Sequence, residues 1–359
     1  MFLDEYLHIA QPDKHARADA WQVAFGLQAV DGLRPSAYMV ETARQHIEGE
    51  LTDNEVQQRI TAYYQTQEGR AEEAGTDEAD GASLRIQRLL TDPSFVFSPA
   101  GLANIHRHIF SGVLPHAGKF RDYNISKKEW VLENASVNYA PFDWIKRTLE
   151  YDFDREKAFS YKHLPLPEVA RHMAEFVSGI WQIHPFREGN TRTTAVFTIK
   201  YLRSLGLYAD NEPFKEHAWY FRNALVRANY ENYASHIERT TEFLELFFRN
   251  ILMGEQNELK SRYTHIRWQG QRPHLAGDGG ENTVQSSVQS SVQTGKSSVQ
   301  IVAWMKQMPG VTAQQLADKL HLTKRAVEKQ IAALRAAGVI RRVGPNKGGH
   351  WEIIQEETC

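Results

Sequence analysis

Apolar residues recur at helical spacing along much of the chain, most regularly before residue 253. They fall at i, i+3 and i+4 within 21–30 and 56–64, which predicts helices in a mainly helical N-terminal region. The polar, Gly-containing stretch 68–82 interrupts this pattern and predicts a loop. Few helix breakers occur from 95 to 253, so we expect the largest helical core there.

Two predicted helices within this core are separated by one short segment. The first helical pattern ends at Ile183 and leads directly into His184-Pro185-Phe186-Arg187-Glu188-Gly189-Asn190-Thr191-Arg192. A second helix is predicted from Val196 onward, with Asn190 or Thr191 as its N-terminal cap and Gly206 as its C-terminal stop. Upstream, residues 119–140 alternate aromatic and β-branched with polar residues, which predicts a β-hairpin.

A change of composition separates the C-terminal part of the chain. Short SSVQ units within 283–300 predict a flexible linker, although valine at every fourth position also permits a weak helix. After them the pattern predicts a short helix, then a helix capped by Thr312, then a helix capped by Thr323 over 324–336, and finally two strand-like runs. This order is typical of a winged helix-turn-helix.

Composition bounds the class of protein. The chain has 359 residues, of which 42% are hydrophobic and 24% charged, as in soluble globular proteins. Its apolar runs fall short of the roughly 18 residues of a membrane span, and its first residues do not resemble a secretion signal. The single cysteine, Cys359, excludes a disulfide framework within the chain. We therefore expect a cytoplasmic protein that does not bind membranes.

Charge is distributed unevenly along the chain. Residues 297–354 contain nine Lys/Arg and three Asp/Glu, which leaves 33 basic and 41 acidic residues elsewhere. Contact with nucleic acid is therefore expected only at the C-terminal end.

The segment 184–192 combines residue types suited to metal-assisted phosphate chemistry. Histidine titrates near neutral pH and can accept a proton, and a carboxylate such as Glu188 can hold Mg²⁺. Gly189 lets the backbone approach phosphate oxygens, and the following helix N-terminus attracts anions. Arg192 can offer a forked donor to a phosphate.

This segment resembles the signature of the Fic/Doc family, HPFx(D/E)GN(G/K)R, whose members mostly transfer AMP from ATP to protein hydroxyls. The resemblance implies a Fic-fold helical core with a β-hairpin flap, and ATP and Mg²⁺ as substrate and cofactor. It implies His184 as general base and Glu188 as metal ligand. The phosphate contacts would come from Arg187, Gly189, Asn190, Thr191 and Arg192.

Two positions depart from the family pattern. Thr191 stands where the family has Gly or Lys, and Ala195 stands where many AMP-transferring members have a second Arg for the γ-phosphate. Lys119 or Arg121 is a candidate replacement for that cation. The departure leaves two alternatives open, namely phosphoryl transfer as in Doc-like members and a DNA-binding regulator that only senses nucleotide.

Other segments resemble further parts of the family. Glu48-Gly49 is similar to the inhibitory pattern (S/T)xxxE(G/N), which implies an N-terminal brake. Tyr123, Asn124, Ile125 and Tyr139 lie where the flap would hold the target by strand addition. Asn229 and Tyr233 lie where the family walls the adenine.

The C-terminal pattern predicts a surface for DNA or, as the alternative, for protein contact or dimerisation. Lys324, Arg325 and Lys329 would enter a major groove, and Arg341, Arg342 and Lys347 would contact phosphates. The sequence does not identify the target protein, and self-modification and homodimers are further expectations. The expected domains are an N-terminal helical region 1–95, a Fic core 96–253, a linker 254–298 and a winged-helix domain 299–356.

Overall fold

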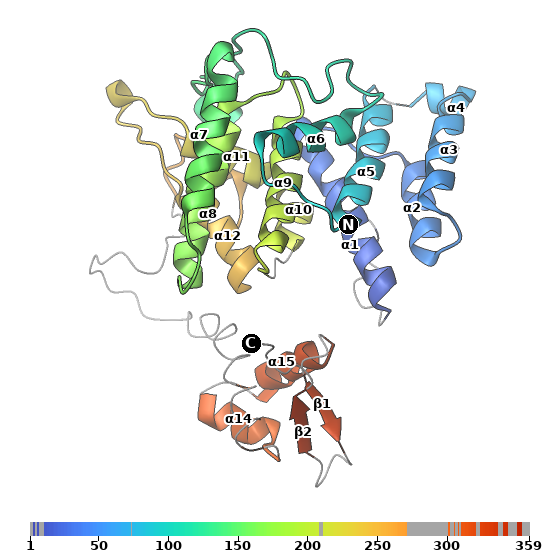
Figure 1. The fold of residues 1–359 in the computed structure, drawn as a ribbon, viewed down its shortest axis with the longest axis vertical. Helices are drawn as coiled ribbons and strands as arrows, with labels where there is room; N and C mark the ends of the chain where they lie inside the picture. The colour runs from blue at the N-terminus through green and yellow to red at the C-terminus, as the bar shows by residue number, and fades with distance from the viewer. Residues whose placement is uncertain are drawn as a thin grey trace. The chain divides into compact units, whose positions relative to one another are not determined.

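The computed structural model describes residues 3, 6, 11–72, 74–207, 211–270, 301, 305, 308, 310–320, 324–336, 340–343 and 350–353. The chain divides into two compact units, Met1–Leu252 with Asn257–Gly277, and Met253–Gln256 with Asp278–Cys359. The mainly helical fold expected from the sequence is confirmed (Figure 1). Among the described helices, none has the length and apolar character that crossing a membrane requires.

The described part of the first unit consists of helices and connecting loops. Its α-helices are α1 (Pro12–Gly26), α2 (Ala37–Glu48), α3 (Asp53–Tyr63), α4 (Gln67–Arg70), α5 (Thr76–Thr91), α6 (Pro99–Phe110), α7 (Ile145–Ala158), α8 (Leu166–Ile183), α9 (Asn190–Ser204), α10 (Glu212–Glu216), α11 (Ala218–Ala228) and α12 (Glu242–Met253). Its 3₁₀ helices are η2 (Leu27–Asp31), η3 (Trp130–Leu132), η4 (Phe142–Trp144), η5 (Tyr233–Ser235) and η6 (Ser261–Thr264).

Helix α9 lies at the centre of the first unit. It packs against α5, α6, α8 and η2, and every residue from Asn190 to Leu202 is buried (Figure 1). A helix buried on all sides needs apolar or internally paired side chains, since an unpaired buried polar group destabilises the fold. Asn190, Thr191 and Arg192 at the start of α9 have such partners, whereas the buried hydroxyl of Thr193 has none among the described residues.

Two hydrophobic clusters hold this unit together, and α1 contributes to both. The larger cluster surrounds α9 and includes Val23 and Ala24 from α1, while the smaller one joins Trp21 and Phe25 to α2 and α3. Burying a large apolar side chain stabilises a fold by about 1.5–3 kcal/mol. The N-terminal helices are therefore an integral part of the unit that contains the motif.

The loop predicted for 68–82 is wrong for most of its length, since only the short connection between α4 and α5 is a turn. Residues Gln67–Arg70 form α4, and α5 already begins at Thr76 after Gly75, whose φ is +89°. Acidic residues in the first turn of a helix interact favourably with its dipole, and Asp77 and Glu78 occupy that turn. Asp80 is buried and accepts hydrogen bonds from the backbone N–H and hydroxyl of Ser36. Tertiary contacts thus stabilise a helix whose composition is typical of loops.

The β-hairpin expected within 119–140 contains no regular strand. The chain does reverse there, through η3, and the Glu129 N–H donates to the Ala135 carbonyl. Elsewhere side chains replace the ladder, since the Lys127 N–H donates to the hydroxyl of Ser136. The buried Glu129 carboxylate receives two hydrogen bonds from Arg222 of α11, at 2.6 and 3.1 Å. The segment is therefore a folded loop anchored by an ion pair.

The segment after α12 begins with residues that pack on the first unit. Leu259 and Tyr263 join the larger cluster, and the Ile266 N–H donates to the Val131 carbonyl. The predicted linker 254–298 therefore starts with packed residues, and most of its remainder, including the SSVQ units, lies outside the described residues.

The described part of the second unit contains α14 (Ala313–Leu320), α15 (Lys324–Ala336) and the antiparallel strands β1 (Ile340–Val343) and β2 (His350–Ile353). Thr312 caps α14 as predicted, because its hydroxyl accepts from the Gln315 N–H while the Gln315 side chain accepts from the Thr312 N–H. Trp351 packs in this core and donates to the Val311 carbonyl at 3.1 Å. The predicted cap at Thr323 lies outside the described residues.

Candidate functional site

Residues 184–189 form a tight loop between α8 and α9, and we call the segment 184–192, which adds the first three residues of α9, the motif loop. His184 ends α8 in the left-handed conformation, with a φ of +50°, and its N–H donates to the Trp181 carbonyl. Gly189, with a φ of +70°, precedes α9, and a Cβ built on it would lie 2.2 Å from the Phe110 ring. Glycine is therefore required here for both conformation and space.

The side chain of Asn190 closes this loop. Its carbonyl oxygen accepts from the Phe186 N–H at 2.9 Å, and its amide donates to the Phe186 carbonyl at 2.7 Å. The predicted cap of α9 is therefore replaced by a bridge back to the loop. Phe186 is buried and stacks on His106, with ring centroids 3.8 Å apart.

His106 of α6 also holds the motif loop in place. Its Nδ1 accepts from the Gly118 N–H at 2.8 Å, so the ring is neutral and its Nε2 donates to the Glu188 carbonyl at 3.1 Å. Burial lowers the pKa of His106 to about 4, which agrees with this arrangement.

Arg121 also fixes the loop, although the sequence made it a candidate phosphate ligand. It is buried, and its guanidinium donates to the carbonyls of His184 at 2.8 Å, Tyr123 at 2.8 Å and Ile183 at 3.2 Å, and to that of Ala140. Its own N–H donates to the Pro185 carbonyl. With its donors engaged in this way, Arg121 shapes the backbone around the motif loop. Lys119 is exposed.

His184 has one ring nitrogen engaged and one free. Its Nδ1 lies 3.3 Å from the Trp181 carbonyl, which can only accept, so Nδ1 carries the proton. Its Nε2 is buried and has no hydrogen-bond partner among the described residues. Burial, and then the nearby charge of Lys127, lowers the pKa of His184 well below its usual value. The side chain is thus a neutral imidazole with a bare Nε2.

Glu188, the predicted metal ligand, lies exposed at the turn before α9, and its carboxylate forms no ion pair with any described residue. The described residues contain no cluster of three His, Cys, Asp or Glu side chains that would hold a metal alone. A single free carboxylate fits Mg²⁺, which usually takes one or two carboxylates together with phosphates and waters.

Arg192 has ionic partners that the sequence did not suggest. It is 2% exposed, and its guanidinium pairs with Glu78 of α5 at 2.6 Å and with Asp31 of η2 at 2.8 Å. The Gln28 side chain accepts a further hydrogen bond at 3.0 Å, and the Phe110 ring lies 4.6 Å from the guanidinium carbon. We call Asp31, Glu78 and Gln28 the Arg192 clamp.

The predicted brake residue Glu48 ends α2 and pairs with Lys14 of α1. Arg187, a predicted phosphate contact, pairs instead with Asp122 at 2.7 Å and lies over the Tyr123 ring. Thr191 accepts from the Trp181 indole N–H at 3.0 Å, which joins the end of α8 to the start of α9.

The predicted flap residues are placed differently from one another. Tyr139 lies against the His184 ring, with centroids 4.2 Å apart. Tyr123 and Asn124 are exposed, and Ile125 is half-buried. Lys127, which the sequence did not single out, lies close enough to His184 and Glu188 for its charge to act on both.

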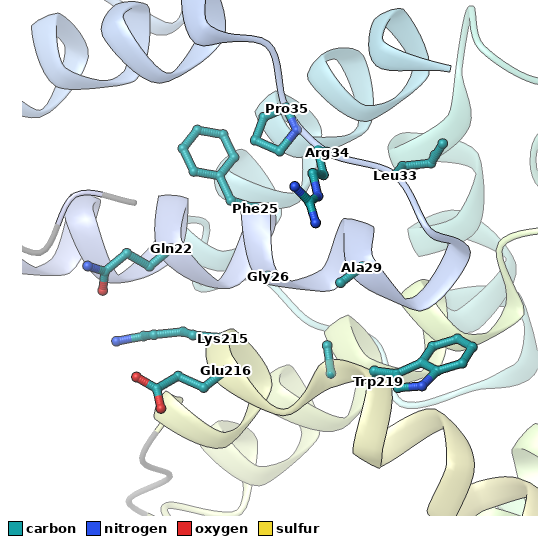
Figure 2. A pocket seen from close by; sticks show the side chains of 11 residues that line it. Gln22, Phe25, Gly26, Ala29, Leu33, Arg34, Pro35, Lys215, Glu216 and Trp219 are labelled. Carbon is teal, nitrogen blue, oxygen red and sulfur yellow. The ribbon is translucent and has the colours of Figure 1, made fainter. Parts of the chain in front are cut away.

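The predicted adenine contacts lie at and beyond the end of α11. The Asn229 amide donates to the Ser178 and Leu225 carbonyls, both at 3.0 Å, and so ties α11 to α8. Tyr233 is 77% exposed and donates to Glu231. A separate cavity of about 570 Å³ lies between α1, α10 and α11 (Figure 2). Phe25, Arg34 and Trp219 line it, but no residue of the motif loop does.

The predicted DNA contacts are partly described. Lys324 is exposed at the start of α15 and pairs with Glu328, and Arg341 pairs with Glu352 across the two strands. Arg342 lies over the Trp351 ring. The side chains of Arg325 and Lys329, and all of Lys347, lie outside the described residues.

Comparisons with known proteins agree with the sequence resemblance. A family model described as Fic/DOC family matches residues 96–202, and one described as HTH domain matches residues 299–347. The search of curated proteins returned no match.

Among the solved structures that are similar to part of the chain, three come from Bartonella. The N-terminal Fic domain of an effector protein from Bartonella sp. AR 15-3 is 21% identical, covers 48% of this chain and 79% of its own, and has a TM-score of 0.39. The N-terminal Fic domain of a putative cell filamentation protein from Bartonella quintana is 23% identical, with coverages of 49% and 80% and a TM-score of 0.38. BepC from Bartonella tribocorum, with bound AMPPNP, is 20% identical, with coverages of 55% and 86% and a TM-score of 0.36.

Proposed function

Since residues 96–202 of this chain form a Fic/DOC family domain, we propose that the protein transfers AMP from ATP to a Ser, Thr or Tyr hydroxyl of a target protein. The observation that carries this proposal is the neutral, buried His184 with its unpartnered Nε2. Such an atom suits a general base, and it is four residues away from the carboxylate that fits Mg²⁺.

The proposed reaction uses the motif loop as follows. The Nε2 of His184 takes the proton of the target hydroxyl while the hydroxyl oxygen attacks the α-phosphorus of ATP. The bond between the α-phosphorus and the bridging oxygen breaks, and pyrophosphate leaves with that electron pair. Glu188 would hold Mg²⁺, which neutralises phosphate charge when bound. The N-terminus of α9 and Arg192 stabilise the negative charge of the phosphates.

Ala195 stands where many AMP-transferring family members have a second arginine. Lys127 is our candidate for the cation that replaces this arginine. Arg121 is engaged by backbone carbonyls, whereas Lys127 has no ion pair among the described residues and acts on the charges of Asp31 and Glu188. Burial lowers its pKa, so an anionic triphosphate would restore a favourable environment for its ammonium group.

We also infer that the Arg192 clamp is the N-terminal brake. Arg192 contacts a nucleotide phosphate only if it exchanges Asp31 and Glu78 for phosphate oxygens. Both carboxylates come from helices outside 96–202, so the N-terminal region restrains the domain. In this proposal Asp31 and Glu78 take the role that the sequence suggested for Glu48, which pairs with Lys14.

Labelled ATP tests the proposed transfer. The full chain is incubated with Mg²⁺, a lysate and ATP labelled at either the α- or the γ-phosphate. We expect protein labelling from the α position only, and none with His184→Ala. Labelling from the γ position would instead support a Doc-like phosphoryl transfer.

DNA contact by the second unit is a second proposed function. The HTH match, the exposed Lys324 at the start of α15 and the basic composition of residues 297–354 support it. Retention of DNA fragments by wild type, with weaker retention by Lys324→Gln, tests this role. Absence of retention by wild type would favour the protein-contact alternative for this unit, and unchanged retention in the variant would show that Lys324 makes no contact with DNA.

A further inference from the structure

A groove of about 650 Å³ lies between α5, α6 and the connection that joins them. No residue of the motif loop lines it, and Lys200 of α9 closes one side. Its volume is within the roughly 300–1,000 Å³ range of small-molecule sites. We call it the α5–α6 groove.

Basic side chains outnumber carboxylates in this groove. Arg85, Arg88 and Lys200 line it together with Asp53 and Asp92, and His108 adds a titratable group. The Oδ1 atom of Asp53 lies 3.6 Å from the Nε atom of Arg88. The side-chain carboxylate of Asp92 accepts hydrogen bonds from the N–H and hydroxyl of Ser94. The Lys200 ammonium donates to the Leu89 and Asp92 carbonyls, both at 2.6 Å. Each carboxylate is thus engaged, and neither pairs with Arg85.

Arg85 has no partner of its own among the described residues. It is half-buried, and its Nη1 is fully buried without a hydrogen bond. It also borders a smaller cavity of about 300 Å³ with Asp77 and Glu78, yet it forms an ion pair with neither. Burial and then the like charge of Arg88, three residues away on the same helix face, lower its pKa.

A half-buried guanidinium without a counter-ion loses part of its hydration, and a ligand of opposite charge would offset that loss. The guanidinium fork matches the oxygens of a phosphate group, with which it forms two parallel hydrogen bonds. Apolar side chains beside the cations, Phe95 and Ile105 among them, leave room for an organic body.

We propose that the α5–α6 groove binds the phosphate group of a small phosphomonoester through Arg85, with Arg88 as the second cation. Binding here needs neither the motif loop nor the transfer reaction. Inorganic phosphate has the same chemistry, so the experiment includes both sources.

Calorimetric titration of the full chain with phenyl phosphate and with inorganic phosphate tests this site. We expect wild type to bind, and Arg85→Gln to bind at least tenfold more weakly. Arg85→Lys keeps the charge without the fork and should lie between them. Arg44→Gln, a change at a solvent-accessible arginine of α2, is the matched control and should bind as wild type does. Tighter binding of phenyl phosphate identifies an organic ligand, and equal binding identifies inorganic phosphate.

Thermal unfolding provides a second readout. Without ligand, Arg85→Gln should unfold at or above the wild-type temperature, because it removes an unpaired, half-buried charge. Phosphate should raise the unfolding temperature of wild type but not that of the variant. Absence of binding by wild type, or phosphate binding that survives in Arg85→Gln, would overturn the proposal, since surviving binding belongs to another site.

Discussion

Arg192 and Glu78 are 114 residues apart in the chain, yet their side chains pair at 2.6 Å. Asp31 completes the arrangement from a third segment. The arginine that the motif offers to phosphate is therefore neutralised by two carboxylates, both placed by helices that precede the Fic/DOC domain.

Removal of the clamp carboxylates should release transfer activity. We expect Asp31→Asn/Glu78→Gln to incorporate label from α-labelled ATP at least tenfold faster than wild type, because Arg192 becomes available to phosphate. Glu48→Gln is the matched control and should leave the rate unchanged, since Glu48 pairs with Lys14. A rate in the double variant no higher than that of wild type would show that the clamp is only structural.

The same double variant should be less stable without nucleotide. Removal of both carboxylates leaves the buried Arg192 charge uncompensated, at a cost below the ~3–5 kcal/mol of a fully buried pair, because Asp31 and Glu78 are partly exposed to water. Mg²⁺ and ATP should recover part of this loss, because a ligand that binds only the folded state stabilises it. Urea unfolding with and without nucleotide measures both effects, and an equal loss under both conditions would argue against phosphate binding by Arg192.

Asn190 should contribute to stability through its bridge to Phe186. Asn190→Ala removes two buried hydrogen bonds and leaves the Phe186 N–H and carbonyl unpaired. We expect a loss of about 2–4 kcal/mol in the free energy of unfolding. Asn124→Ala, which removes one exposed hydrogen bond to the Phe142 N–H, should cost less than about 1 kcal/mol. Equal losses in the two variants would contradict the bridge.

Gly189 should tolerate no side chain. In Gly189→Ala the new Cβ meets the Phe110 ring at 2.2 Å and the residue keeps a φ of +70°, so we expect a loss of about 3 kcal/mol. Gly206→Ala, with a φ of +71° and nothing within 4 Å, should lose only the backbone part, about 1–2 kcal/mol. A Gly189→Ala loss as small as that of Gly206→Ala would mean that the loop readily moves away from Phe110.

The free energy of unfolding should decrease at acid pH, partly because His106 becomes protonated. Its pKa is about 4 in the folded protein and about 6.5 in the unfolded chain, so the unfolded chain binds more protons between these values. Stabilisation is therefore complete above pH 6.5 and is lost as the pH falls through 4, by about 3 kcal/mol in total.

Urea unfolding from pH 7 to pH 4 checks this dependence. His106→Gln should show a smaller fall than wild type, whereas His15→Gln, a change at an exposed histidine, should keep the wild-type dependence. An unchanged pH dependence in His106→Gln would contradict a neutral, bridging His106.

The helices around the motif were predictable because local pattern determines them. The apolar spacing before His184 agrees with the observed end of α8, and the helical pattern from Val196 onward agrees with the body of α9. The 68–82 loop was wrong because α5 owes its first turns to distant partners, Ser36 for Asp80 and Arg192 for Glu78. No local signal could reveal them.

For the same reason the sequence missed the clamp. Glu78 lay in the predicted loop, and Asp31 belongs to no sequence motif that would indicate a functional role. The expected hairpin is a loop, and the Glu129–Arg222 ion pair that anchors it joins segments 93 residues apart, which no local pattern indicates. The roles of His184, Glu188 and the other motif residues stay predictions until they are measured.

Mass spectrometry of the transferred group tests the central claim most directly. The Asp31→Asn/Glu78→Gln protein is incubated with Mg²⁺, ATP and a lysate, with and without the additional change His184→Ala. We predict an adenylyl group on a Ser, Thr or Tyr hydroxyl that disappears when His184 is replaced. A phosphoryl group at that hydroxyl, or an adduct that persists without His184, would contradict the account.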